Sequence, residues 1–385
     1  MFDISERMKK LPPYLFAEID KKRKKLIAEG KEVISFGVGD PDLPTPERIV
    51  NAMRKAVGDP SVHRYPFGKG RADFRKAIAD YYKKYSSVSL DPETEICVLI
   101  GSKEGIAHFP LAFINPGDVT LVPEPGYPVY QIGTILAGGI PYFMPLKEEN
   151  DFLPDFGKIP DDVLSKAKIL YLNYPNNPTG ACADDEFLKD AVKFCKKHNL
   201  ILLYDAAYHE MYFEGKRPVS FLSIPGAKDI GIEIHSLSKT YNMTGWRIGW
   251  ACGNEKLVSA LATLKENIDS GTFEAIQIAG VECLTGNQED VVEMRKIYQE
   301  RRDVLIEGLK KLKFRVKIPV ATFYLWLNVG GDSLAFADKL LSEAHIIVTP
   351  GIGFGPSGEG YVRFALTIDK NMIKKAIERM ENVLK

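Results

Sequence analysis

The feature that most constrains the fold is an alternation of short apolar runs with amphipathic stretches between residues 95 and 252. The runs have the length of buried strands and occupy residues 96–100, 119–122, 169–173, 200–204, 232–235 and 248–252. Strands that alternate with helices are typical of a mostly parallel sheet with helices on both faces. Such sheets bind ligands at the carboxyl ends of their strands, so we expect the loops there to converge on a site.

The chain has 385 residues, which is more than one hydrophobic core usually accommodates. After residue 287 the pattern changes to a helix (290–311), two strands (314–318 and 322–327), a helix (333–344), two short strands and a helix from Lys370. Residues 1–40 are too few to fold alone and are expected to pack on this second unit. The prediction is an α/β large domain (41–286) and a smaller α+β domain (1–40 with 287–385).

Composition narrows the classes of partner. Lysine and arginine total 51 and so do aspartate and glutamate, which leaves no net charge to attract nucleic acid or an anionic membrane. No apolar run approaches a membrane span and the polar N-terminus lacks a signal sequence, so we expect a cytoplasmic protein that acts on small molecules. Five widely spaced cysteines without a C-x-x-C pair predict neither a disulfide framework nor a metal site.

The segment 235–250 places one lysine, Lys239, among hydroxyl groups with an arginine eight residues later. Lys239 can form an imine with an aldehyde, while Ser236, Ser238 and Arg247 can bind a phosphate dianion. This pattern is typical of a lysine-bound, phosphate-bearing cofactor such as pyridoxal phosphate. The alternative is a surface loop between two strands.

Further residues match the other requirements of such a cofactor. Asp205, at the end of an apolar strand, can keep a pyridine nitrogen protonated, although an aspartate there is often a helix cap. Asn177 and Tyr208 can donate to a phenolic oxygen, although 176–180 also has the composition of a turn. Tyr127, in a turn stiffened by proline and glycine, can pack on the ring or simply in the core.

Two more segments can hold anions. Ser102 and Lys103 open a predicted helix (106–113) whose free N–H groups favour phosphate. The Lys103 side chain can face substrate or solvent. The spacing of a nucleotide P-loop is missing here. Arg363, an isolated arginine in an apolar strand, suits the α-carboxylate of an amino acid.

These motifs, in this order and over nearly the whole chain, resemble the fold-type I pyridoxal-phosphate aminotransferases of class I/II. Within that group, segments 11–16, 37–46, 100–108, 174–180, 236–247 and 267–271 are most similar to the LL-diaminopimelate aminotransferases. The resemblance implies a ping-pong transfer of an amino group between LL-2,6-diaminopimelate, an intermediate of lysine biosynthesis, and 2-oxoglutarate.

The resemblance also implies roles for individual residues. Lys239 would be the Schiff-base lysine and proton shuttle, and Asp205 and Tyr127 would act with it on the cofactor. Gly39, Lys103, Asn177, Tyr14, Asn267 and Arg363 would contact substrate. Tyr65, as a cofactor-binding residue, and Asn267 would reach in from a partner subunit, so the site would require a homodimer. Plant-type members carry a glutamate for the substrate's distal ammonium where this chain has Gly68.

The alternatives are an aminotransferase for aspartate, aromatic residues or alanine, and a carbon-sulfur β-lyase that uses the same cofactor residues. A cofactor-binding regulator would need a DNA-binding extension and a basic face, and the sequence predicts neither.

Overall fold

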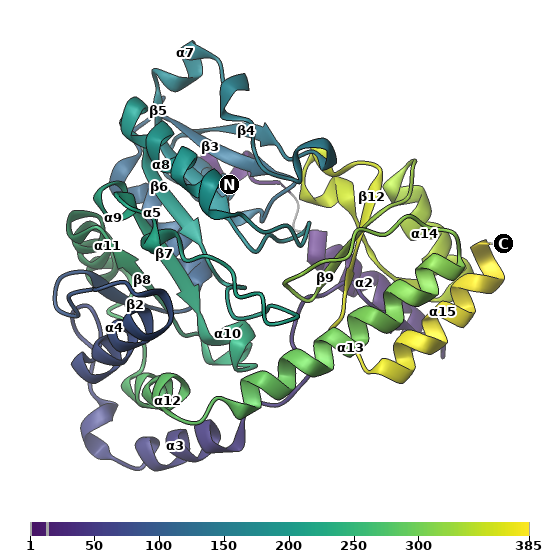
Figure 1. Ribbon diagram of the computed structural model, residues 1–385, viewed down its shortest axis with the longest axis horizontal. Helices are drawn as coiled ribbons and strands as arrows, with labels where there is room; N and C mark the ends of the chain where they lie inside the picture. The colour runs from purple at the N-terminus through teal and green to yellow at the C-terminus, as the bar shows by residue number, and fades with distance from the viewer. Residues whose placement is uncertain (1, 13–14, 385) are drawn as a thin grey trace.

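The computed structural model describes residues 2–12 and 15–384. A seven-stranded sheet and a three-stranded sheet lie side by side, and the long helix α13 (Glu289–Lys311) runs from one to the other (Figure 1). Within these described ranges, no helix is both long enough and apolar enough to cross a membrane.

The larger sheet confirms the predicted α/β class. In spatial order its strands are β2 (Ile96–Leu99), β8 (Gly249–Gly253), β7 (Gly231–Ser236), β6 (Ile201–Asp205), β5 (Ala167–Asn173), β3 (Val119–Glu124) and β4 (Ile140–Pro145). β8 is antiparallel to both of its neighbours, and the other pairings are parallel. β4 was not predicted: its residues are apolar, but two prolines interrupt the run, and as an edge strand it is largely exposed.

Helices cover both faces of this sheet, as predicted. One core lies under α5 (Ser102–Phe113), α6 (Val129–Leu136) and α11 (Glu255–Ile268). The opposite core lies under α4 (Ala72–Ser86), α8 (Asp185–His198) and α12 (Glu274–Thr285). Successive residues of one strand serve opposite faces: Leu202 and Tyr204 pack in one core and Leu203 in the other. Strands buried on both sides explain the continuous apolar runs in the sequence.

The remaining helices near this sheet are α3 (Glu47–Val57), α7 (Asp161–Leu164), α9 (Ala227–Ile230) and α10 (Leu237–Thr240).

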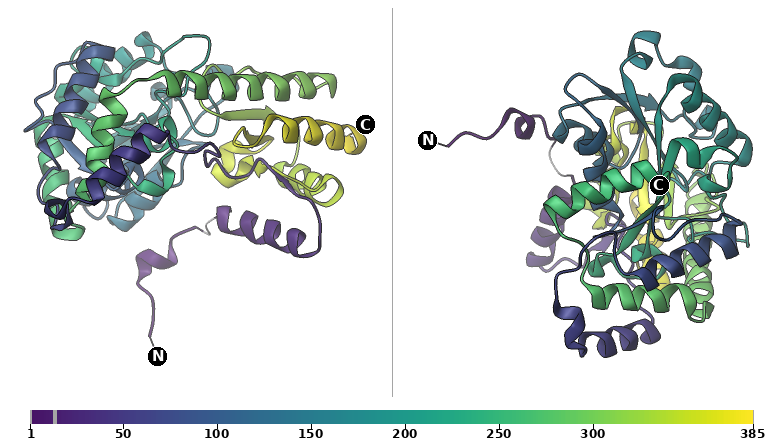
Figure 2. Two further views of the ribbon diagram at one scale, coloured as in Figure 1. Left: turned by 90° about the horizontal axis from the view of Figure 1, so that it is seen from below. Right: turned by 90° about the vertical axis from the view of Figure 1, so that its left-hand side faces the viewer.

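The smaller sheet is antiparallel, in the order β11 (Thr349–Pro350), β12 (Tyr361–Ala365) and β9 (Tyr324–Asn328). It packs with α13, α14 (Ser333–Ala344) and α15 (Lys370–Leu384), which confirms the α+β class of the second unit. From the N-terminal part, β1 (Ile34–Ser35) pairs with β10 (Ile346–Ile347). α2 (Leu15–Ala28) precedes it. α1 (Glu6–Lys9) lies against α6, and the residues before α1 extend away from the body (Figure 2). The domain boundaries at residues 41 and 287 stay a prediction.

Two sequence predictions need correction. Residues 314–318 form no strand: Phe314 and Val316 pack against the core, but no strand in the described part of the chain pairs with this segment. The backbone pairs only further on, where the Phe213 N–H donates to the Val320 carbonyl and Tyr212 bridges Ala321. The alternation of apolar and polar residues in this segment therefore reflects an extended chain on the protein surface, with every second side chain turned inward, and not a paired strand. The helix expected over 106–113 begins earlier, at Ser102.

Candidate active site

The predicted site residues converge where the parallel strands end. Asn173, Asp205 and Ser236 are the last residues of β5, β6 and β7. Beside them is a cavity of about 210 Å³ that also receives residues from the smaller sheet. The predicted residues that line it are Gly39, Ser102, Tyr127, Asn177, Asp205, Tyr208, Lys239 and Arg363.

Lys239 projects into this cavity from α10, the short helix that follows β7. Its Nζ donates to the Gly39 carbonyl over 3.1 Å. Burial lowers the pKa of Lys239 to about 8; the charges of Arg363 and Arg247 act in the same direction and that of Asp40 in the other. An amine with this pKa is neutral in about one molecule in ten at pH 7, far more often than an ordinary lysine, and a nucleophile or general base must be neutral.

Asp205 is 4% exposed and lies at the cavity wall. Its Oδ2 accepts a hydrogen bond from the Tyr130 hydroxyl over 2.8 Å, and its Oδ1 accepts one from the Ala207 N–H over 3.1 Å. Burial raises the pKa of Asp205 to about 6, against the two hydrogen bonds, which lower it. A buried carboxylate of this kind is stabilised by a cation placed beside it.

Arg363 reaches the cavity from β12 of the smaller sheet and is 1% exposed. Its guanidinium donates to Asn177 Oδ1 over 2.8 Å and to the Gly37 carbonyl over 2.9 Å. The Tyr324 ring lies 4.2 Å from the guanidinium carbon. Hydrogen bonds and ring contacts fix the orientation of this planar donor, which suits two-point recognition of a carboxylate.

A candidate anion site adjoins the cavity at the start of α5. Gly101 precedes Ser102 with φ +76°, and a Cβ at Gly101 would collide with the guanidinium of Arg247. The arginine therefore packs directly on the turn that exposes the first N–H groups of the helix. Partial burial and the charge of Arg247 lower the pKa of Lys103. Ser236 and Ser238 are buried nearby, and Ser236 Oγ accepts a hydrogen bond from the Ser238 N–H.

The remaining predicted residues do not line the cavity within the described part of this chain. Tyr65 is 74% exposed and contacts the Phe67 ring. Asn267 is exposed on α11, where its amide donates to the Thr263 carbonyl. Their predicted action from a partner subunit stays a prediction. Tyr14 lies outside the described residues.

Sequence reasoning missed three residues of the site. Tyr130 binds Asp205, and Tyr324 lines the cavity with its hydroxyl 3.0 Å from that of Tyr208. Asn173 Oδ1 accepts a hydrogen bond from the Asn177 N–H and its amide donates to the Asp205 carbonyl. Asn173 could have been identified from the sequence, because it is a polar residue at the end of an apolar strand. Both tyrosines stand among apolar neighbours, so the sequence did not distinguish them from core residues.

The fold and the site together define a class of protein: the chain belongs to the aminotransferase class I and II family, whose pattern it matches over residues 31–380. It is 54% identical over 381 residues to the LL-diaminopimelate aminotransferase of Syntrophobacter fumaroxidans, covering 98% of each chain. Among solved structures, it resembles substrate-bound BacF from Bacillus subtilis, with TM-score 0.95, 40% identity and coverage of 99% and 98%. It also resembles a single mutant of Thermus thermophilus aspartate aminotransferase, with TM-score 0.92, 28% identity and full coverage of both chains. The predicted enzyme class, an aminotransferase, is confirmed.

Proposed function

We propose that this enzyme is a pyridoxal-phosphate-dependent aminotransferase that transfers an amino group from LL-2,6-diaminopimelate to 2-oxoglutarate. The observation that carries the proposal is the convergence of Lys239, Asp205 and Arg363 on one small cavity. An amine with a lowered pKa, a buried carboxylate and an oriented guanidinium are the groups that the reaction requires of the protein.

The residues present fit the cofactor. Asp205 would sit at the ring nitrogen, Tyr208 and Asn177 at the phenolic oxygen and Tyr127 on the ring face. At the phosphate would lie Ser102, Lys103, Ser236, Ser238 and Arg247, with Tyr65 contributed by the partner subunit. When bound, pyridoxal phosphate supplies an aldehyde that accepts the substrate's amino group and a ring that withdraws electrons from Cα.

Each protein group then has a defined task. Arg363 binds the α-carboxylate, with the Gly39 backbone, and thereby sets which bond of Cα faces Lys239. The neutral amine of Lys239 removes the Cα proton and would deliver it to the aldehyde carbon of the cofactor. The Asp205 carboxylate balances the positive charge on the ring nitrogen. Tyr208 is oriented by Tyr324, whose hydroxyl lies 3.0 Å away.

The substrate proposal rests on similarity and on the distal end of the site. The relative from Syntrophobacter fumaroxidans is 54% identical, whereas the aspartate aminotransferase variant is 28% identical. Gly68 cannot bind the distal ammonium as the plant-type glutamate does. We assign the distal group to Lys103 and Tyr14 and to the partner's Asn267.

We also propose a homodimer. Tyr65, Phe67 and Ile268 are 74%, 77% and 51% exposed. Gly271 lies against the Pro66 carbonyl, so the two segments that carry these side chains meet. Large apolar side chains gathered on one surface favour burial in an interface.

The test is an assay of the purified enzyme with pyridoxal phosphate and 2-oxoglutarate, in which glutamate formation is followed. The amino donors are LL-diaminopimelate, meso-diaminopimelate, aspartate, alanine and phenylalanine. We expect LL-diaminopimelate to be strongly preferred. A preference for aspartate or an aromatic donor would overturn the substrate assignment. Release of pyruvate and ammonia without a keto-acid acceptor would instead indicate a β-lyase.

A further inference from the structure

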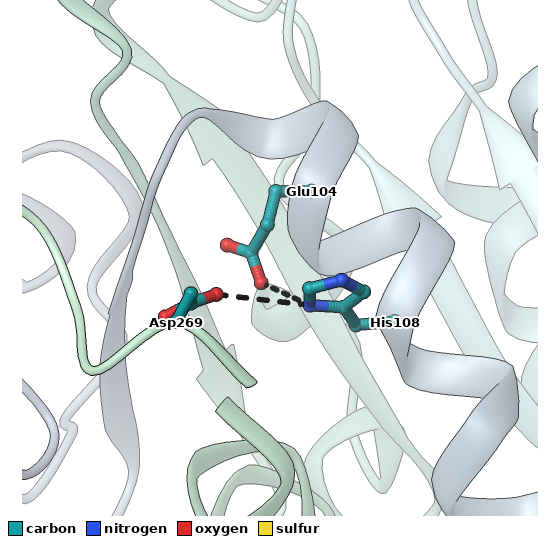
Figure 3. A group of neighbouring side chains, drawn as sticks. All are labelled: Glu104, His108 and Asp269. Carbon is teal, nitrogen blue, oxygen red and sulfur yellow. Dashed lines mark ion pairs between the residues drawn. The ribbon is translucent and has the colours of Figure 1, made fainter. Parts of the chain in front are cut away.

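A cluster of ionisable side chains lies behind the start of α5, outside the cavity. Figure 3 shows Glu104 and His108 on successive turns of α5 with Asp269 facing them across a short gap. His108 Nδ1 lies 2.7 Å from Glu104 Oε1 and 3.9 Å from Asp269 Oδ2. The cluster joins a helix of the anion site to the end of α11.

Lys265 of α11 completes this cluster and is 2% exposed. Its Nζ donates to Glu104 Oε2 over 2.9 Å and to both Asp269 carboxylate oxygens over 3.1 Å. The carboxylates and His108 have the spacing of possible metal ligands, with their atoms within 4.8 Å of one another. The ammonium already provides the compensating positive charge, so we interpret the group as a lysine-centred ion cluster. Burial raises the pKa of Glu104, but its contacts with His108 and Lys265 lower that pKa by more, which favours the ionised carboxylate.

On one side, the cluster holds the turn that forms the anion site. Glu104 Oε2 also accepts a hydrogen bond from the Ile100 N–H over 3.0 Å, which closes the turn between β2 and α5. That turn contains Gly101, packed on Arg247, and Ser102, which lines the cavity. The position of Glu104 therefore determines where the first N–H groups of α5 point.

On the other side, the cluster holds a surface segment. Asp269 Oδ1 accepts a hydrogen bond from the Gly271 N–H over 3.0 Å. Buried Gln277 then donates to the Thr272 carbonyl over 2.6 Å and accepts from the Arg71 N–H over 2.7 Å. These bonds fix the turn 269–272 against the segment 66–71, next to the exposed Tyr65.

We infer that Lys265 is a positioning residue for the phosphate group of the cofactor: it holds Glu104, and through it the start of α5 at the site of its own subunit, and it holds Asp269, which anchors the segment beside Tyr65. The inference rests on the proposed function, because it presupposes that a phosphate binds at this turn. It predicts a defect specific to the phosphate, since Lys265 touches neither the ring site at Asp205 nor Lys239.

The test compares pyridoxal phosphate with pyridoxal, which lacks the phosphate, by fluorescence titration of the apoenzyme. The variants are Lys265→Met and Glu104→Gln. The matched control is Arg302→Met, because Arg302 is also a buried cation, 3% exposed, that pairs with two carboxylates, Glu214 and Asp303. If Lys265→Met does not fold, Glu104→Gln carries the test, since Lys265 then keeps Asp269 as its counter-ion.

We expect Lys265→Met to bind pyridoxal phosphate at least about tenfold more weakly than wild type, which is about 1.4 kcal/mol. Glu104→Gln should lose severalfold, while both variants bind pyridoxal like wild type and Arg302→Met binds both ligands like wild type. Equal losses for pyridoxal and its phosphate, or equal losses in Arg302→Met, would mean a purely structural role and would overturn the inference. A wild-type protein that binds neither compound would instead refute the proposed function itself.

Discussion

The hydroxyl of Tyr130 in α6 donates a hydrogen bond of 2.8 Å to Oδ2 of Asp205, the last residue of β6. Tyr130 stacks on the Tyr171 ring, with centroids 5.2 Å apart, so its hydroxyl is held in place by the core. The carboxylate at the floor of the site thus has its ionisation adjusted by a residue that does not itself line the cavity.

Removing this bond should change the pH dependence of cofactor binding. The hydrogen bond lowers the pKa of Asp205, which burial raises to about 6, so Tyr130→Phe should raise that pKa further. Protonated Asp205 cannot balance a charged ring nitrogen, and affinity should fall as pH drops through the pKa. We expect the affinity to begin falling at a higher pH in Tyr130→Phe than in wild type. The measurement is a titration of the apoenzyme with pyridoxal phosphate between about pH 5 and 8, where folded proteins are usually most stable. Tyr171→Phe is the control, and coincident profiles for the two variants would contradict the role of the bond.

The ionised Asp205 side chain should destabilise the folded apoenzyme. Its pKa rises from an ordinary value of 3.8 to about 6 on folding, so the group favours the folded state when protonated and opposes it when ionised. Asp205→Asn should therefore stabilise the apoenzyme above about pH 6 by about 1–3 kcal/mol, with the gain disappearing as pH falls through 6 toward 4. Chemical denaturation at a series of pH values measures this. A variant less stable than wild type at pH 8 would show that the carboxylate is compensated in the apoenzyme.

Lys239→Ala should abolish turnover, because the general base and the covalent anchor are lost together. We expect kcat to fall by at least about 10³-fold, while weak non-covalent binding of pyridoxal phosphate persists through the anion site. Rate assays and absorbance titration separate the two effects. The matched control is Lys196→Ala, a lysine paired with Asp229 on the surface. Undiminished activity in Lys239→Ala would refute the mechanism.

Arg363→Lys should impair substrate binding even though the substitution retains the positive charge. Lysine cannot reproduce the planar donor that contacts Asn177 and the Gly37 carbonyl, and the α-carboxylate would lose two-point recognition. We expect KM for the amino donor to rise about 10- to 100-fold, which corresponds to about 1.4–3 kcal/mol. Affinity for pyridoxal phosphate should change little. A loss confined to cofactor affinity would reassign Arg363 to the cofactor.

The sequence determined the sheet class and most of the site. Buried strands require continuous apolar runs, and loops at the ends of parallel strands require polar residues, so both patterns are visible in the chain itself. Asp205 and Arg363 could be identified because each is an ionisable residue in an apolar run, where a charge costs free energy without a partner. Lys239 could be identified from the hydroxyl groups and the arginine that accompany it. The edge strand β4 and the false strand at 314–318 show the limit. Pairing requires a neighbouring strand, and the local sequence of a segment does not show whether folding places one beside it.

Only the tertiary structure decided which side chains act together. Tyr130 and Tyr324 look like core residues until folding brings their hydroxyls to Asp205 and Tyr208. Glu104 and Lys265 are 161 positions apart in the chain, and their ion pair exists because α5 and α11 pack on the same face of the sheet. Local sequence can specify a residue's chemistry, but hydrogen bonds and ion pairs act over a few ångströms, and those distances are set by packing.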